Sequence, residues 1–288
     1  MKNFILAARP RTLLAGVIPP LVSYFYFYSS TDNHRVAWGI LCISGALFIQ
    51  LATNFFNDVI DFKKGADAKR VGPTRVSAAG LVDIKTVEFW AWSCVFAAAL
   101  IGIPIIIRGG WPFIVIGPIS LYLTFGYTGG KVSLAYRGLG ELFVFLFFGL
   151  FSVIGSFYIY SKTVDERIVT LASIYGLLAT TFICINNLRD RETDAEVGKK
   201  TLATRMSVHS YRTFTLITIF LPYLLLLHFL SFRYVFVTYL ALLPALILAK
   251  ITLKKSGAEL NEGLKFSGIH MIIFSILLCG VFLSEHHV

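Results

Sequence analysis

Long apolar runs recur along the whole chain and alternate with short polar segments. A helix needs about 20 mostly apolar residues to cross the hydrocarbon core of a bilayer. Nine runs come within a few residues of that length, and we predict that they are membrane spans: residues 12–28, 36–56, 86–107, 111–127, 139–160, 168–185, 214–230, 234–251 and 266–283. The fourth run is interrupted by Pro112, Gly117 and Pro118.

Composition agrees with this hydropathy pattern. Of the 288 residues, 56% are hydrophobic and 15% are charged, and the mean hydropathy is +0.74. An ordinary soluble domain carries about 25% charged residues. The sequence therefore predicts an all-α fold, a polytopic transmembrane bundle of nine helices.

The positions of lysine and arginine predict how the bundle is oriented, because cytoplasmic loops of membrane proteins are enriched in both. With a cytoplasmic N-terminus, 21 of the 26 lysines and arginines fall in cytoplasmic segments, and the other five fall on the far side: Arg35, Arg108, Lys162, Arg167 and Arg233. We expect the C-terminus on that far side and a bacterial inner membrane as the location. This distribution explains most of the +10 net charge without a nucleic-acid partner.

Two of the cytoplasmic loops contain similar polar sequences. NFFNDVIDFKKGADAKRVGPTRVS begins at Asn54, and NNLRDRETDAEVGKKTLATRMS begins at Asn186. Asn57 and Asp61 correspond to Asn186 and Asp190 at an offset of 129 residues, and TRVS corresponds to TRMS at an offset of 130. The repeat indicates a single transmembrane domain, residues 1–288, with pseudo-repeated halves of about 1–137 and 138–288.

Each of these loops begins while the preceding span is still helical, so residues three or four apart share a face. The acids and amides therefore form stripes that point toward one cavity: Asn57 with Asp61, Asn54 with Asp58 and Asp61, and Asn186 with Asp190 and Asp194. Carboxylates at membrane depth need water or a positive partner. Hard oxygen ligands of this kind suit Mg²⁺, which substrate phosphates and water complete. The pattern predicts that Mg²⁺ bridges the protein to a diphosphate, with ligands from Asn57, Asp58, Asp61, Asp190 and Asp194.

Basic residues follow the acids in both loops, among them Arg70 and Arg75 in the first and Lys200 and Arg205 in the second. Such cations can stabilise the charge that develops on a diphosphate leaving group. Lysines and arginines next to a membrane are also common topology signals and lipid contacts. For any single basic residue, that simpler explanation stays open.

Several motifs resemble those of the UbiA superfamily of intramembrane aromatic prenyltransferases, and the match covers nearly the whole chain. They are RPRTL at Arg9, NDVID at Asn57, KGAD at Lys64, RVGPTR at Arg70, and NNLRDRETD with GKKTLATR in the second loop. RVGPTR and the motifs of the second loop look most like the 1,4-dihydroxy-2-naphthoate polyprenyltransferase branch.

The resemblance implies a nine-helix bundle around a cavity that opens sideways into the lipid. It also implies that Mg²⁺ joins a polyprenyl diphosphate to the two motifs, that the allylic bond ionises, and that an aromatic ring captures the carbocation. For this branch the acceptor is 1,4-dihydroxy-2-naphthoate, which loses its carboxylate and yields demethylmenaquinone. The catalytic positions of the family fall on Asn57, Asp61, Asn186, Asp190 and Asp194, and Asn54 and Asn187 are expected to contact the substrate.

One motif departs from the family. Many members have a further aspartate eight residues after the first motif asparagine, whereas this chain has Gly65 there and Asp67 two residues later. The naphthoate branch shows a similar shifted form. We include Asp67 among the metal ligands, directly or indirectly.

The loop FGYTGGKVSLAYRGLGE also resembles the family. The resemblance places Lys131 on the diphosphate and Tyr127 and Tyr136 at the cavity mouth, where their ring faces can attract the cation. An interfacial aromatic belt with a topology lysine is the simpler alternative. Glu141, which opens the fifth span, either orients the acceptor or caps its helix.

Two other functions stay open at this point. A transporter of a cation or phosphate compound also has internal repeats and ionisable groups between helices, but its site usually lies near the middle of the membrane. Here the acids lie at the cytoplasmic ends of spans, which favours an enzyme. Within the enzymes, 4-hydroxybenzoate or homogentisate is an alternative acceptor. The sequence indicates neither prenyl chain length nor oligomeric state.

Overall fold

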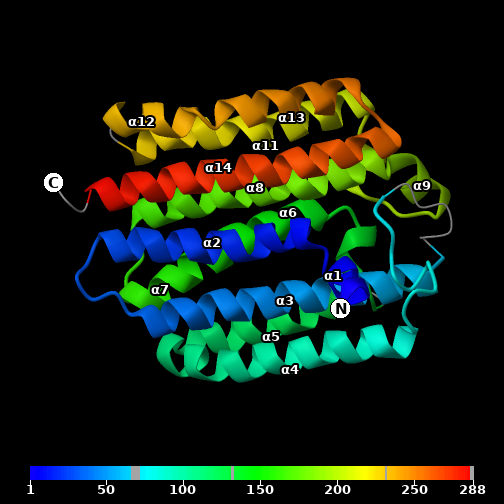
Figure 1. Ribbon diagram of the computed structural model, residues 1–288, viewed down its shortest axis with the longest axis horizontal. Helices are drawn as coiled ribbons and strands as arrows, with labels where there is room; N and C mark the ends of the chain where they lie inside the picture. The colour runs from blue at the N-terminus through cyan, green and yellow to red at the C-terminus, as the bar shows by residue number, and fades with distance from the viewer. Residues whose placement is uncertain (66–71, 131–132, 231, 286–288) are drawn as a thin grey trace.

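The computed structural model describes residues 1–65, 72–130, 133–230 and 232–285, and all of their side chains except those of residues 232, 233 and 285. The described part contains helices and connecting segments and no strand. Most of the helices run along one long axis, with the N-terminal α1 and the short α9 toward the same end (Figure 1). The first five helices are α1 Lys2–Ala8, α2 Pro10–Ser29, α3 Val36–Lys63, α4 Ile84–Gly109 and α5 Trp111–Gly126.

A short 3₁₀ turn, η1 Leu134–Tyr136, leads into a continuous helical segment made of α6 Gly140–Val144, the π-helical η2 Phe145–Ile154 and α7 Gly155–Ser161. The remaining elements are α8 Glu166–Arg189, α9 Arg191–Glu196, α10 Leu202–Arg205, α11 Val208–Phe229, α12 Phe232–Tyr239, α13 Leu242–Lys254, η3 Gly257–Leu260 and α14 Asn261–Glu285.

Within the described residues, seven helices are long and apolar enough to cross a membrane, which confirms an integral membrane protein. The fourth predicted span is the 16-residue helix α5, and the eighth is divided into α12 and α13. Pro244 lies in the first turn of α13, and because it has no N–H, it cannot extend a helical ladder back to Leu240. The count of nine spans therefore stays a prediction.

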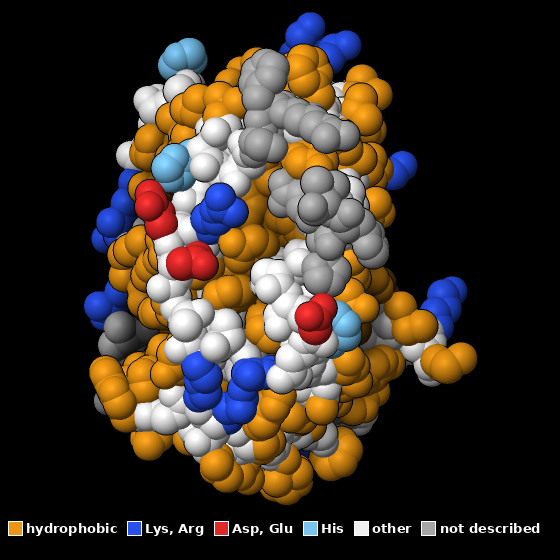
Figure 2. All heavy atoms as spheres, turned by 90° about the vertical axis from the view of Figure 1, so that its left-hand side faces the viewer, with side chains coloured by type: hydrophobic (Ala, Val, Ile, Leu, Met, Phe, Trp, Pro, Cys, Tyr) orange, Lys and Arg blue, Asp and Glu red, His pale blue; other side chains and the backbone are white. Residues whose placement is uncertain are grey.

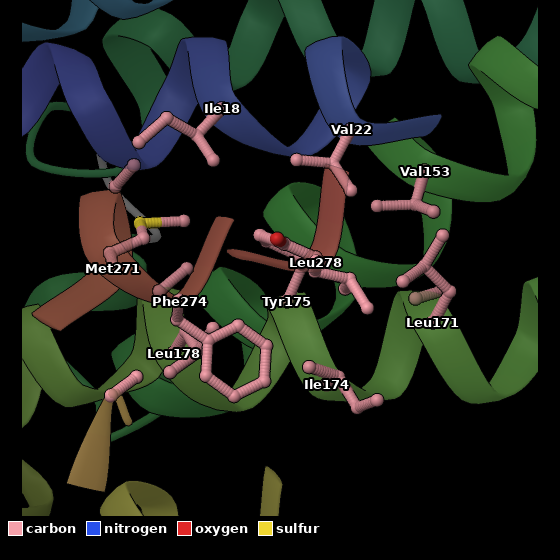
Figure 3. Packing of buried hydrophobic residues seen from close by; sticks show 14 of the residues in the cluster. Ile18, Val22, Val153, Leu171, Ile174, Tyr175, Leu178, Met271, Phe274 and Leu278 are labelled. Carbon is pink, nitrogen blue, oxygen red and sulfur yellow. The ribbon is translucent and has the colours of Figure 1, made fainter. Parts of the chain in front are cut away.

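Helix α8 lies in the centre of the bundle, where it packs against η2, α11, α2 and α14. Figure 3 shows its residues Leu171, Tyr175 and Leu178 among apolar side chains of α2 and α14. The one polar atom of the buried Tyr175 side chain is satisfied, because its hydroxyl donates to Ser275 Oγ at 2.9 Å. This packing fixes the position of α8, which carries the second polar motif at its C-terminal end.

The end of the bundle opposite α9 is largely covered by apolar side chains, among which charged side chains are scattered (Figure 2). Three of the predicted far-side cations have a structural role at α7. Arg108 Nε donates to the carbonyl of Ile159 at 2.6 Å, Arg35 donates to the next carbonyl, and Lys162 donates to the carbonyl of Arg108. Cations at helix C-termini satisfy the last carbonyls and complement the helix dipole.

Candidate active site

A polar cavity of about 90 Å³ lies where the ends of α3, α5 and α8 meet the start of α6. Its lining combines acids, bases and amides that the sequence separates by more than a hundred residues. It contains Arg9, Asn57, Asp61, Arg75, Tyr127, Thr128, Glu141, Asn186, Asn187, Arg189, Asp190, Lys199 and Thr201. The two loops that the sequence predicted to face each other therefore share one cavity.

The first loop contributes a buried ion pair. Asp61 lies near the end of α3, and its Oδ2 accepts a hydrogen bond from Arg75 Nη2 at 2.5 Å. Only 8% of Asp61 and 6% of Arg75 is exposed, so water screens the pair weakly. Asn57, one turn earlier, accepts a hydrogen bond from the hydroxyl of Thr128. Two polar side chains of α3 are thereby directed into the cavity.

The second loop contributes two further pairs. Arg189, the last residue of α8, donates to both carboxylate oxygens of Asp190, at 2.7 and 2.6 Å. Lys199 Nζ donates to Asp194 Oδ1 at 3.2 Å. Three predicted ligand acids of the two motifs thus each have a basic partner.

Two ionisable groups of this region have shifted pKa values. Burial raises the pKa of Asp194, and the neighbouring charges of Asp190 and Asp61 raise it further, while Lys199 acts in the opposite direction. Burial also lowers the pKa of Lys64, against the influence of Asp61. The acids and bases of both loops are close enough to act on one another.

Asp58 has surroundings that differ from those expected of a metal ligand. It is 1% exposed, and its two oxygens accept hydrogen bonds from the backbone amides of Val76 and Ser77, at 3.1 and 2.9 Å. It does not line the polar cavity. Asp58 therefore holds the returning loop against α3, since a carboxylate that accepts from two amides is already well solvated by them.

Asn54 also joins elements together. Its Nδ2 donates to the carbonyl of Ala8 at 2.8 Å, which fastens the N-terminal segment to α3, and its Oδ1 accepts from Gln50, one turn earlier on the same helix, at 3.3 Å. Asn54 does not line the polar cavity, although it was predicted to contact the substrate.

Tyr136 stands between basic residues of the two loops. Lys64 Nζ lies 4.0 Å and Lys199 Nζ 5.6 Å from the centre of its ring. The Tyr136 ring therefore attracts two lysines of the protein, and its contact with the substrate cation stays a prediction. Tyr127 lines the polar cavity itself.

The remaining predicted residues divide into three groups. Asn186 and Asn187 line the cavity. Lys200 and Arg205 are exposed and do not line it, although the backbone carbonyl of Lys200 and the guanidinium of Arg205 pack beside Gly138. Asp67, Arg70 and Lys131 lie outside the residues that the structure describes.

The residues present fit a hard divalent cation. Asp61 Oδ1 and Asp194 Oδ2 are buried and have no hydrogen-bond partner in the described part of the chain. Within that part, no group of three or more His, Cys, Asp and Glu side chains could hold a metal alone. Separate carboxylates with one uncommitted oxygen each suit Mg²⁺, whose remaining positions are filled by water and phosphate oxygens.

An apolar cavity of about 390 Å³ adjoins the polar one, and Tyr127 and Thr124, near the end of α5, lie in its wall. Tyr127 lines both cavities. Small residues on α2, α3 and α4 give the apolar cavity its width, among them Gly16, Gly45 and Gly102. Aromatic side chains of η2 complete the wall. A charged head group and a long apolar tail could therefore be bound side by side.

Comparison with known proteins decides the family. Residues 16–282 match the model of the UbiA prenyltransferase family. The chain belongs to this family. The resemblance inferred from the motifs is confirmed, and the protein is a membrane-bound prenyltransferase.

Two curated relatives illustrate the similarity within the UbiA family. A 1,4-dihydroxy-2-naphthoate octaprenyltransferase of Haemophilus influenzae is 32% identical over 217 residues, which cover 72% of this chain and 70% of the relative. The enzyme of the same name from Mycobacterium leprae is 27% identical over 282 residues, 96% of this chain and 95% of the relative.

Solved structures of UbiA homologues share the fold. A homologue from Aeropyrum pernix K1 has a TM-score of 0.68 at 14% identity, over 96% of this chain and 98% of that one. A homologue from Archaeoglobus fulgidus bound to GPP and Mg²⁺ has a TM-score of 0.63 at 16% identity, over 98% and 99% of the two chains. At these identities the likeness concerns the helical architecture.

Some cavity residues were not among the predicted site residues: Arg9, Thr128, Arg189, Lys199 and Thr201. All five lie inside the family-like motifs RPRTL, FGYTGGKVSLAYRGLGE, NNLRDRETD and GKKTLATR, so the sequence carried a signal for each of them.

Proposed function

We propose that this UbiA-family prenyltransferase transfers a polyprenyl group from polyprenyl diphosphate to 1,4-dihydroxy-2-naphthoate in a Mg²⁺-dependent reaction, with loss of the carboxylate, to give demethylmenaquinone. One observation carries the donor part of the proposal. The charged cavity and the apolar cavity adjoin at Tyr127, so a diphosphate and its attached hydrocarbon chain can occupy them together.

The basic side chains of the polar cavity are suited to bind the diphosphate. Arg75 and Lys199 each hold a carboxylate in the structure described here. When a diphosphate binds, we expect these cations to turn toward its oxygens, which frees Asp61 and Asp194 to act as metal ligands. Mg²⁺ held by these acids and Asn57 would supply Lewis-acid stabilisation of the leaving diphosphate.

The protein's own groups then favour ionisation of the allylic bond. Once they have turned toward the bound diphosphate, the guanidinium and ammonium groups stabilise the charge that accumulates on the departing oxygen. The Tyr127 ring, at the junction of the cavities, is placed to attract the allylic cation by its face. Apolar walls beyond it exclude the water that would otherwise capture this cation.

The acceptor is proposed from the relatives. Five of them, from five bacteria, carry the name 1,4-dihydroxy-2-naphthoate octaprenyltransferase, and a more distant one from Synechocystis is named 2-carboxy-1,4-naphthoquinone phytyltransferase. The acceptor class recurs among these names while the prenyl group differs. We accordingly propose the naphthoate acceptor and leave the donor chain length open.

We further propose that the N-terminus and both motif loops face the cytoplasm and that the C-terminus faces the opposite side of a bacterial inner membrane. The bias of lysine and arginine toward one set of loops supports this orientation. A soluble aromatic acceptor would then reach the polar cavity directly from the cytoplasm.

Turnover by the purified protein in lipid tests the proposal. The assay supplies Mg²⁺ and a long polyprenyl diphosphate, with dihydroxynaphthoate, 4-hydroxybenzoate or homogentisate as acceptor. We expect prenylation and CO₂ release from the naphthoate, with no turnover when Mg²⁺ is chelated. Prenylation of only one of the other acceptors would overturn the naphthoate assignment while keeping the donor chemistry.

A further inference from the structure

Glu141 is a buried acid whose surroundings the donor chemistry does not explain. It lies in the first turn of α6, is 4% exposed, and lines the polar cavity. Its Oε1 accepts hydrogen bonds from Asn187 Nδ2 at 2.9 Å and from the Tyr211 hydroxyl at 2.6 Å. Its Oε2 is buried and has no hydrogen-bond partner in the described part of the chain.

These contacts argue against a helix-capping role for Glu141. Both donors are side chains, and they come from α8 and α11 rather than from the backbone of α6. A capping carboxylate would accept from the free amides of its own first turn. Two distant helices instead hold one oxygen of Glu141 and leave the other uncommitted.

Glu141 lies close to the junction of the two cavities. A Cβ atom added to the neighbouring Gly140 would lie 2.8 Å from the hydroxyl of Tyr127, so the Tyr127 side chain passes directly over the start of α6. Tyr127 also lines both cavities. Glu141 therefore lies beside the place where, under the proposed function, the allylic carbon meets its acceptor.

We propose that Glu141 binds the hydroxylated aromatic acceptor, with Oε2 accepting a hydrogen bond from a phenolic hydroxyl, and that Asn187 and Tyr211 are positioning residues that hold the carboxylate. This inference rests on the proposed function, because it assigns the acceptor subsite of that reaction. An unpaired buried carboxylate oxygen is costly, and a phenolic O–H is a donor that satisfies it.

The geometry also assigns Glu141 a proton-transfer role. A ring carbon donates an electron pair to form the new carbon–carbon bond, and the allylic carbon–oxygen bond breaks with its pair remaining on the diphosphate. The phenolic proton passes to Oε2, which leaves the ring as a neutral ketone. Loss of a ring proton to water, or of the ring carboxylate as CO₂, then restores the aromatic ring, and its oxygen recovers the proton from Glu141. A base positioned at the phenol raises the nucleophilicity of the ring during attack.

The test compares Glu141→Gln with the parent protein, using the aromatic acceptor and its two monomethyl ethers. Glutamine retains the size of the side chain and removes the proton acceptor. We expect kcat/KM for the phenol to fall about 10- to 150-fold, the loss expected for a hydrogen bond to a charged group.

The methyl ethers separate a contact with the acceptor from a structural effect. If Oε2 receives the phenolic hydrogen, one of the two ethers should have the same kcat/KM in the parent and in Glu141→Gln. That ether carries a methyl group in place of the hydrogen, so neither protein can make the contact with it. Glu262→Gln, the same change at an exposed acid paired with Lys255, is the matched control and should behave as the parent. A penalty that is the same for the phenol and both ethers would overturn the proposal.

A second variant serves if Glu141→Gln does not fold. Tyr211→Phe removes one of the two donors to Oε1 and leaves the aromatic packing, and it should reduce the preference for the phenol over its ether. An unchanged preference would overturn the proposal. If instead the parent protein binds prenyl diphosphate but prenylates no hydroxylated aromatic compound, the proposed function itself fails, and this outcome is visible before any variant is made.

Discussion

Asp58 and Asp61 lie one turn apart on α3, and both are buried. Asp58→Asn is expected to lower stability and to leave turnover intact, whereas Asp61→Asn is expected to abolish turnover and to leave the fold intact. In Asp58→Asn one carboxylate oxygen becomes an NH₂ group that faces a backbone N–H of Val76 or Ser77. The variant loses a charge-assisted hydrogen bond worth about 1.5–3 kcal/mol and leaves a buried donor unsatisfied at about 1–3 kcal/mol. Together these two terms give an expected loss of about 2.5–6 kcal/mol of stability.

Catalysis should respond differently to Asp58→Asn. The side chain does not line the polar cavity, so each folded molecule should still turn over substrate with the same Mg²⁺ requirement. The decisive measurements are the free energy of unfolding in detergent, and turnover per folded molecule at a temperature where the variant is still native. A variant with parental stability and no turnover would refute the reasoning and restore Asp58 as a metal ligand.

The other predictions concern the two cavities and Asp194, which does not line the polar cavity but pairs with Lys199 in its wall. Asp61→Asn or Asp190→Asn should abolish turnover while the bundle stays folded, which thermal unfolding and a turnover assay would show; activity in both variants would contradict the metal assignment. Asp194 has a raised pKa and binds a metal only when ionised, so activity should fall toward acid pH. Lys199→Met removes the charge that lowers this pKa, and the acidic limb should move to higher pH; an unmoved limb would contradict this. Gly102→Leu, in the apolar wall where an added Cβ meets nothing within 4 Å, should impair long donors more than short ones, measured as a ratio of kcat/KM values; equal losses would contradict a chain site there.

Helical spacing predicted that the two motifs belong together but could not predict how their charges pair. Asp61 pairs with Arg75, fourteen residues later, because α3 continues past Asp61 to Lys63 and the loop must return to its side. Asp190 follows the last residue of α8 and pairs with its immediate neighbour Arg189. The two loops have similar sequences, yet they differ locally because one acid lies within a helix and the other lies just beyond one.

Other features depend on contacts that a single sequence does not reveal. The partners of Glu141 are 46 and 70 residues away, on helices whose rotation is set by packing. Hydropathy also gave no sign of the π-helical η2, where a Cβ on Gly149 would lie 2.5 Å from the Cα of Gly176. The absence of a side chain at Gly149 lets η2 approach α8 this closely, and η2 also forms part of the apolar wall.

The pairing of Asp61, Asp190 and Asp194 with basic side chains has a consequence for substrate binding. An unpaired group of carboxylates at the membrane surface would repel itself, and burial would increase the cost. With Arg75, Arg189 and Lys199 in place, the cavity is close to electrically neutral before substrate arrives. A diphosphate alone would add uncompensated negative charge, whereas a diphosphate with divalent cations restores the balance. The same bases that neutralise the resting cavity can then transfer to the phosphates while the metal takes their place on the acids. This exchange predicts that metal and diphosphate bind cooperatively, each weakly without the other, and independent binding of the two would contradict it.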